Sequence, residues 1–113
     1  MRTVLKVEKE SQLNALIKKK KYQDFVILFH SLWCDDSKKL LELAKEKWSE
    51  QDGDLVLHTI SSWDVPHGFV AFQVTQVPTL ITCKKGRIRK HDYFPQIHNY
   101  LSGSSGSRTT GRV

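Results

Sequence analysis

The run of apolar residues Phe25–Phe29 is the feature that most narrows the folds open to this chain. Successive side chains of a strand point to opposite faces, so an unbroken apolar run predicts a strand that is buried on both faces. Such a strand belongs in the middle of a partly parallel sheet that helices cover on each side. The chain has 113 residues, which is enough for one domain with a modest core. The run therefore favours an α/β fold.

The rest of the chain predicts strands and helices on either side of this run. The expected order is β-α-β-α-β-α-β-β-α, over residues 3–7, 11–21, 25–29, 34–50, 55–60, 61–76, 79–83, 87–93 and 95–101. Ser11 is expected to cap the first helix. Residues 61–76 are expected to form only one or two irregular turns, because Pro66 suits a first helical turn but Gly68 disfavours a longer helix. The early alternation, and a closing hairpin joined by residues 84–86 (Lys-Lys-Gly), predict three α/β/α layers with a central mixed sheet.

Composition and charge exclude several classes of protein. With 39% hydrophobic and 27% charged residues, the chain is typical of a soluble globular protein. No apolar run is long enough to span a membrane, and the first residues lack the apolar segment of a secretory signal, so we expect a cytoplasmic location. The net charge is +6, and its densest part is Lys18–Lys21 at the predicted end of a helix. Cations there interact favourably with the helix dipole, so we expect a solvated surface and no nucleic-acid partner.

The two cysteines differ in their sequence settings. Cys83 ends the apolar stretch of a predicted strand, so we expect it to be a buried small hydrophobic residue. Cys34 lies where the strand at 25–29 leads into the following helix. The first turn of a helix presents unpaired N–H groups and the positive end of the dipole, which favour a thiolate, the nucleophile of disulfide chemistry. Cys34 is therefore the candidate catalytic residue.

The residues around Cys34 modify this expectation. Asp35 and Asp36 suit the first helical turn, but they carry the same sign of charge as a thiolate and so oppose it. Ser37 lies one helical turn after Cys34, where a second cysteine would resolve a mixed disulfide. Its hydroxyl is expected to take a catalytic part by donating a hydrogen bond to the thiolate. His30 would add to this stabilisation if it were protonated and close.

Three passages resemble the thioredoxin family. The strand at 25–29 that leads into Trp33-Cys34 is similar to the family's active-site strand and its Trp-Cys motif. Residues 76–80 (Gln-Val-Pro-Thr-Leu) are similar to the family's Ile-Pro-Thr segment. Residues 84–88 (Lys-Lys-Gly-Arg-Ile) are similar to the Lys-Asn-Gly turn of the last hairpin. The resemblance implies a thioredoxin fold with an active site at Cys34.

The resemblance covers residues 1–101, which we expect to form one domain, followed by a disordered polar tail at 102–113. It implies a cis peptide bond before Pro78 and a clamp in which backbone groups near this proline bind an extended substrate. An ordinary trans proline at the start of an edge strand is the alternative. The substrate-binding residues that the resemblance implies are Trp33, Asp35, Asp36, Val77, Pro78 and Thr79.

The sequence departs from the family pattern at positions that serve the second half of dithiol exchange. Thioredoxins have Cys-Gly-Pro-Cys where this chain has Cys-Asp-Asp-Ser. Leu28 occupies the place of a buried aspartate on the active-site strand, and Thr59 that of a lysine near it. His30 replaces a tryptophan, and Glu42 takes the place of a proline that kinks the helix. These changes predict a thiol that captures a disulfide without efficient self-release.

Two functions follow. In the first, Cys34 forms mixed disulfides with a thiol- or disulfide-containing protein or with glutathione, and an external thiol releases it. Such a protein would be a monomeric monothiol oxidoreductase or isomerase, with glutathione as a co-substrate and no cofactor. In the second, the groove beside Pro78 docks a partner protein without redox activity. Loss of the second cysteine favours the second function, and retention of Trp33 and Cys34 favours the first.

Three other kinds of site are disfavoured. A monothiol glutaredoxin that binds an iron–sulfur cluster would carry a Cys-Gly-Phe-Ser loop, which is absent. A zinc site is disfavoured because His30, Cys34, His67 and His91 lack the spacing of ligand pairs. A cysteine protease is disfavoured because no family-specific sequence accompanies Cys34.

Overall fold

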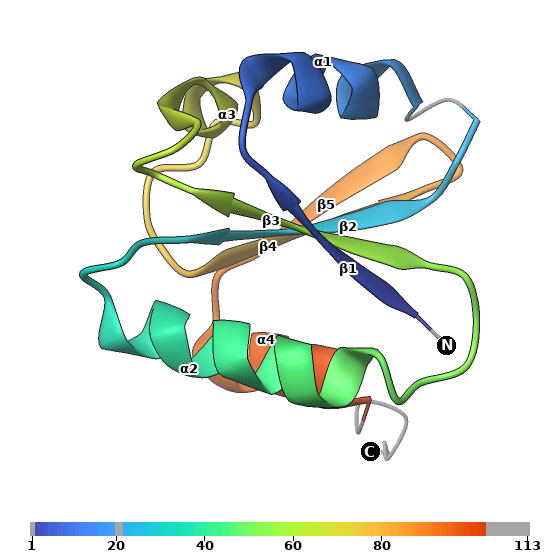
Figure 1. Cartoon of the computed structure of the whole chain (residues 1–113), viewed down its shortest axis with the longest axis vertical. Helices are drawn as coiled ribbons and strands as arrows, with labels where there is room; N and C mark the ends of the chain where they lie inside the picture. The colour runs from blue at the N-terminus through green and yellow to red at the C-terminus, as the bar shows by residue number, and fades with distance from the viewer. Residues whose placement is uncertain (1, 20–21, 104–113) are drawn as a thin grey trace.

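A computed structural model describes residues 2–19 and 22–103 of the chain (Figure 1). Its elements are β1 (Thr3–Val7), α1 (Glu10–Lys19), β2 (Phe25–His30), α2 (Asp35–Leu43), the π-helical segment η1 (Ala44–Trp48), β3 (Val56–Ser61), α3 (Pro66–Ala71), β4 (Thr79–Lys84), β5 (Arg87–His91) and α4 (Phe94–Ser102). Of the predicted tail, Ser102 ends α4 and Gly103 follows it with a φ of 81°. The remaining tail, and residues 20–21 of the lysine run, lie outside the described residues.

The strands form one mixed sheet in the order β1-β3-β2-β4-β5. β1 and β2 are both parallel to β3, whereas β4 is antiparallel to β2 and to β5. Helices α1 and α3 cover one face of this sheet, and α2 and α4 cover the other (Figure 1). The predicted three-layer architecture with a central mixed sheet is confirmed.

The apolar run at 25–29 forms β2 together with His30, and all six residues of this strand are buried. Phe25, Ile27 and Phe29 belong to the core cluster under α1 and α3. Val26 and Leu28 belong to the second cluster, under α2 and α4. Residues 25–29 of the strand are apolar without interruption because they separate two cores, as expected for a central strand.

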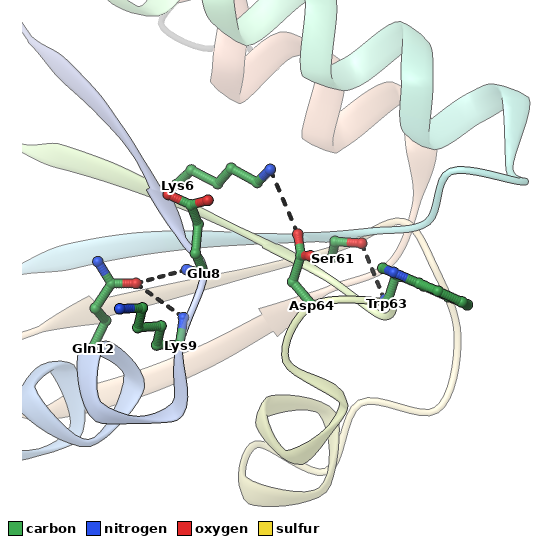
Figure 2. Close-up of polar contacts among 7 residues, drawn as sticks. All are labelled: Lys6, Glu8, Lys9, Gln12, Ser61, Trp63 and Asp64. Atoms are coloured by element: carbon green, nitrogen blue, oxygen red, sulfur yellow. Dashed lines mark hydrogen bonds and ion pairs between the residues drawn. The ribbon is translucent and has the colours of Figure 1, made fainter.

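The structure corrects two expectations about helices on the α1 and α3 side. Ser11 lies inside α1 and does not cap it; instead Oε1 of Gln12 accepts hydrogen bonds from the backbone N–H groups of Glu8 and Lys9, at 2.7 and 3.0 Å (Figure 2). The segment after β3 contains α3, a helix of 6 residues, so the one or two turns expected there form, but as a regular α-helix. A Cβ at Gly68 would lie 3.5 Å from side-chain atoms of Ile60 and Leu13, so packing against these elements stabilises a helix that intrinsic propensity disfavours.

Helix α2 ends in a π-helical segment rather than in a regular last turn. This segment buries Trp48, whose indole N–H donates a 3.1 Å hydrogen bond to the carbonyl of Thr3 and whose ring stacks on Tyr100. At the edge of the sheet opposite β1, the hairpin between β4 and β5 has positive φ at Lys85 (52°) and Gly86 (79°). The glycine therefore takes the left-handed conformation that the sequence predicts for this turn.

Candidate active site

Cys34 is the residue that caps the N-terminus of α2. Its backbone is extended, with φ −106° and ψ 114°, and its carbonyl accepts the N–H of Lys38 at 3.0 Å, which closes the first helical turn. Its own N–H donates to the carbonyl of Ser31 at 3.3 Å. The side chain is partly exposed. The junction between β2 and α2 thus holds the sulfur at the open end of a helix, as the sequence predicts.

The sulfur lies against the segment around Pro78. The Cys34 thiol donates a long hydrogen bond to the Val77 carbonyl, with 3.8 Å between Sγ and O. The peptide bond between Val77 and Pro78 is cis. Next to it, the Thr79 hydroxyl donates to the carbonyl of Gln76 at 2.7 Å and holds this turn. Residues 43 positions apart in the sequence are therefore in contact.

Two tryptophans lie exposed next to this site. The side chain of Trp33 is 71% exposed and that of Trp63 is 70% exposed. Their rings meet edge to face, with centroids 5.9 Å apart. Asp35 and Asp36 are also exposed, at the start of α2. Of the predicted contact residues, Trp33, Asp35 and Asp36 are thus accessible to a partner, whereas Val77 is half-buried and Pro78 and Thr79 are buried.

Trp63 is the residue that sequence reasoning missed, although a signal was present. Ser31 and Ser61 are each followed two positions later by a tryptophan, and each serine oxygen accepts the N–H of that tryptophan, at 3.3 and 3.1 Å. The backbone N–H of Ser62 also donates to the carbonyl of His30, at 3.1 Å. Two similar turns after neighbouring strands bring the two indole rings together.

Ser37 lies one turn into α2 and is fully buried. Its hydroxyl has no hydrogen-bond partner among the described residues. The expected hydrogen bond to Cys34 is therefore absent in this conformation. A buried polar atom without a partner costs free energy, and such atoms are often found at functional sites.

His30 is also buried, and it cannot help a thiolate in the manner expected from the sequence. Burial lowers the pKa of this imidazole below its ordinary value, and the ammonium groups of Lys6 and Lys45 lower it further against an opposing effect of Asp64. The side chain is therefore neutral near pH 7 and supplies no positive charge. Its Nε2 has no partner among the described residues.

The structure also places three other residues that the sequence analysis singled out: Leu28, Thr59 and Cys83. Leu28 and Thr59 are register partners on β2 and β3, and both are buried. The positions that the family fills with an aspartate and a lysine thus form one neutral pair. Cys83 is fully buried in the cluster under α1 and α3 and forms no disulfide with Cys34. Its role as a buried hydrophobic residue is confirmed.

The model of the thioredoxin family matches residues 3–103 of the chain. The chain belongs to the thioredoxin family. Among solved structures it is similar to thioredoxin O2 from Arabidopsis thaliana in its oxidized state (TM-score 0.76, 16% identity, 88% of this chain and 92% of that one). It is also similar to Schistosoma mansoni thioredoxin (TM-score 0.72, 18% identity, 89% of this chain and 94% of that one). These identities show the shared fold. Among curated proteins, no match is found.

Membership of the thioredoxin family indicates thiol–disulfide exchange in general, with protein thiols or disulfides as substrates. Within the described residues, no group of three or more His, Cys, Asp or Glu side chains is placed to hold a metal ion. None of the helices in the described part of the chain is both long and apolar enough to cross a bilayer.

Proposed function

We propose that the chain is a thiol–disulfide exchange protein with Cys34 as its single nucleophile. The observation that carries this proposal is the position of Sγ, partly exposed at the N-terminus of α2 and 3.8 Å from the Val77 carbonyl. The other cysteine cannot resolve a mixed disulfide, because Cys83 lies in the core at the far end of β4 from Thr79, about 13 Å along an extended strand.

The exchange proceeds in two displacements. The Cys34 thiolate attacks one sulfur of a disulfide R–S–S–R′, forms the bond Cys34–S–S–R and releases R′–S⁻. A second thiolate, such as glutathione, then attacks the sulfur of R, which returns the Cys34 thiolate and leaves R–S–S–glutathione. The protein ends in the redox state in which it began, and the net result is transfer of the group R–S from R′–S to glutathione. Release of the protein therefore depends on an external thiol.

The groups around Cys34 indicate how a substrate is held. The backbone beside Pro78 offers hydrogen-bonding groups to an extended peptide, and the exposed ring of Trp33 supplies an apolar contact next to the sulfur. Asp35 and Asp36 carry negative charge at the same place. Glutathione is itself an anion, so we propose a substrate protein with a neutral or basic segment as the favoured partner and glutathione as the poorer one.

Intact-mass analysis after incubation with oxidised glutathione tests the proposal. We expect one adduct on the wild-type chain and none on Cys34→Ser. Cys83→Ala is the matched control, because it removes the other sulfur, and it should retain the adduct. An adduct that persists in Cys34→Ser, or a wild-type chain that stays unmodified while a free cysteine peptide reacts, would refute the proposal.

Docking without turnover is the second candidate, and the pair of exposed tryptophans favours it. Rings that are 71% and 70% exposed are typical of a surface that contacts another protein. Removing the sulfur of Cys34 distinguishes the two functions. A docking module binds its partner equally well with Cys34→Ser and loses affinity with Trp33→Ala, whereas an exchange protein loses the covalent complex with Cys34→Ser.

A further inference from the structure

A cavity of about 490 Å³ lies beside the sheet, apart from the contact between Cys34 and Val77. Its walls come from β1, β2 and β3, from α2 and η1, and from the turn after β3. These three strands are parallel, and His30 and Ser61 of the lining are the last residues of β2 and β3. Crevices at the carboxyl ends of parallel strands are where open α/β sheets bind ligands. The volume is within the range of small-molecule sites.

The polar part of the lining is charged and incompletely satisfied. His30 is 5% exposed, and its Nε2 has no partner among the described residues. The ammonium of Lys6 faces the carboxylate of Asp64, with 3.6 Å between Nζ and Oδ2 (Figure 2). Lys45 contributes a second ammonium from η1. With a neutral imidazole, two ammonium groups against one carboxylate leave the lining with a net positive charge.

The rest of the lining is largely apolar. Leu41 of α2 and Leu32 of the turn after β2 form part of the wall, together with the ring of Trp63. Figure 2 shows Trp63 directed away from the ion pair of Lys6 and Asp64, on the same loop as Asp64. A ligand in this cavity thus meets an apolar surface on one side and positive charge on the other.

We propose that this cavity binds a small organic anion with an apolar ring. The acidic group of the ligand lies near Lys45 and Lys6, and its ring packs against Leu41 and Trp63. The cavity shares Trp63 with the surface beside Cys34, but neither Cys34 nor Val77 lines it, so the proposal does not depend on the chemistry of the sulfur.

The dye 1-anilinonaphthalene-8-sulfonate has the required combination of ring and acidic group, and it tests the proposal on the full chain. We expect saturable binding of one dye per folded chain in a fluorescence titration. In two-dimensional amide NMR spectra, the shifts should concentrate at residues 30–32, 41–45 and 61–64. Absence of saturable binding to the folded chain, or shifts confined to another surface, would overturn the proposal.

Three variants locate the dye. Lys45→Glu reverses a charge of the lining and should weaken binding about fivefold. Lys38→Glu is the matched control, since it makes the same change on an exposed position of α2 outside the cavity, and it should leave the affinity unchanged. His30→Phe fills space and removes Nε2, so it should abolish binding. Equal effects of the two lysine variants, or full affinity in His30→Phe with a native amide spectrum, would also overturn the proposal.

The same variants keep this inference separate from the proposed function. Lys45 takes no part in the site around Cys34, so Lys45→Glu should form the glutathione adduct as the wild type does. Loss of dye binding with retained adduct formation identifies the cavity as a second site. Failure of the adduct in the wild type would leave the dye result unaffected.

Discussion

The two faces of the sheet are packed with different kinds of side chain. Under α1 and α3, the residues of β2 that face the core are Phe25, Ile27 and Phe29, and the cluster is apolar along the whole strand. Under α2 and α4, Val26 and Leu28 continue this pattern, but the next residue in the alternation is His30. On the neighbouring strand β3, the buried residues of this face change in the same way, from Leu57 to Thr59 and Ser61.

This difference shows where buried polar residues replace apolar packing near the candidate active site. The polar end of the α2 and α4 face lies at the carboxyl ends of β2 and β3, where α2 begins with Cys34. Of the three buried side-chain polar atoms without partners among the described residues, those of His30 and Ser37 lie at this end of the face, whereas the third belongs to Arg2, whose guanidinium lies over Trp48. Their cost is offset by the continuous apolar packing elsewhere, since net stability is a small difference between large terms. The core under α1 and α3 is apolar throughout, whereas the core under α2 and α4 becomes polar at the end where Cys34 lies.

The largest expected effect comes from a substitution on the apolar face. Phe29 is fully buried, and its ring meets those of Phe69 and Phe72 at centroid distances of 5.0 and 5.8 Å. Phe29→Ala should lower the free energy of unfolding in urea by about 3–5 kcal/mol, because it leaves a cavity in a dry core. Phe29→Leu, with a smaller loss, keeps the measurement possible if the alanine variant does not fold.

The matched substitution on the other face is His30→Leu, at the adjacent position of β2. It should change the free energy of unfolding by less than about 1 kcal/mol, because it removes an unsatisfied buried nitrogen together with some packing. If His30→Leu were as destabilising as Phe29→Ala, the distinction between the two faces would fail.

A pH effect of intermediate size tests both faces together, since each has a histidine with a lowered pKa. Burial, aided by Lys19, lowers the pKa of His58 from 6.5 to about 4. Burial also lowers the pKa of His30. Below pH 6.5 the unfolded chain therefore binds protons that the folded chain does not, so stability is lost as the pH falls.

Urea unfolding at pH 7 and pH 5 measures this loss. We expect the free energy of unfolding to fall by roughly 1 kcal/mol for His58 between these two values, after allowance for its partial exposure, and to fall further in the same direction because of His30. His58→Gln and His30→Gln should each remove part of the dependence. A double variant whose stability falls as steeply as that of the wild type would contradict the assignment.

A smaller effect is expected at the exposed start of α2, where the polar end of the sheet meets solvent. Asp35→Asn and Asp36→Asn each remove a negative charge beside Cys34, so each should raise the rate of adduct formation with oxidised glutathione about two- to fivefold. Glu46→Gln, an exposed change of the same kind in η1, should leave this rate unchanged. A high-salt buffer should reduce the gain, which stopped-flow alkylation or mass analysis over time can follow.

The contrast between the faces also explains how much the sequence could predict. The apolar run of β2 and the Lys-Lys-Gly turn are local signals, and both elements form where the sequence places them. The regular helix α3 depends on contacts of Gly68 with Ile60 and Leu13, which are distant in sequence, so propensity alone underestimates it. The π-helical segment η1 has no marker in a 3.6-residue periodicity, because its geometry depends on how Trp48 is buried.

Only the features of the site that depend on residues close together in the sequence, or on the family resemblance, could be predicted. The strand-to-helix junction predicts the position of Cys34, and the resemblance to thioredoxins implies a substrate clamp around Pro78, where the structure places Val77 against the sulfur. The neutral state of His30 depends on burial and on lysines from two other elements, which no sequence window contains. The contact between Trp33 and Trp63 likewise depends on the pairing of β2 with β3.

The smallest expected effect concerns the hydroxyl of Ser37. Its removal tests the reactivity of Cys34 without a large change in the free energy of unfolding. Because this hydroxyl is buried without a partner among the described residues, Ser37→Ala should change the free energy of unfolding by less than about 0.5 kcal/mol. Thr79→Val is the contrasting change, since its hydroxyl bonds the Gln76 carbonyl at 2.7 Å, and it should lose about 1 kcal/mol. If the Ser37 hydroxyl donates to the thiolate once it forms, Ser37→Ala slows the alkylation of Cys34 by iodoacetamide at unchanged stability. An unchanged rate would assign Ser37 to packing alone and leave Cys34 as the whole of the reactive site.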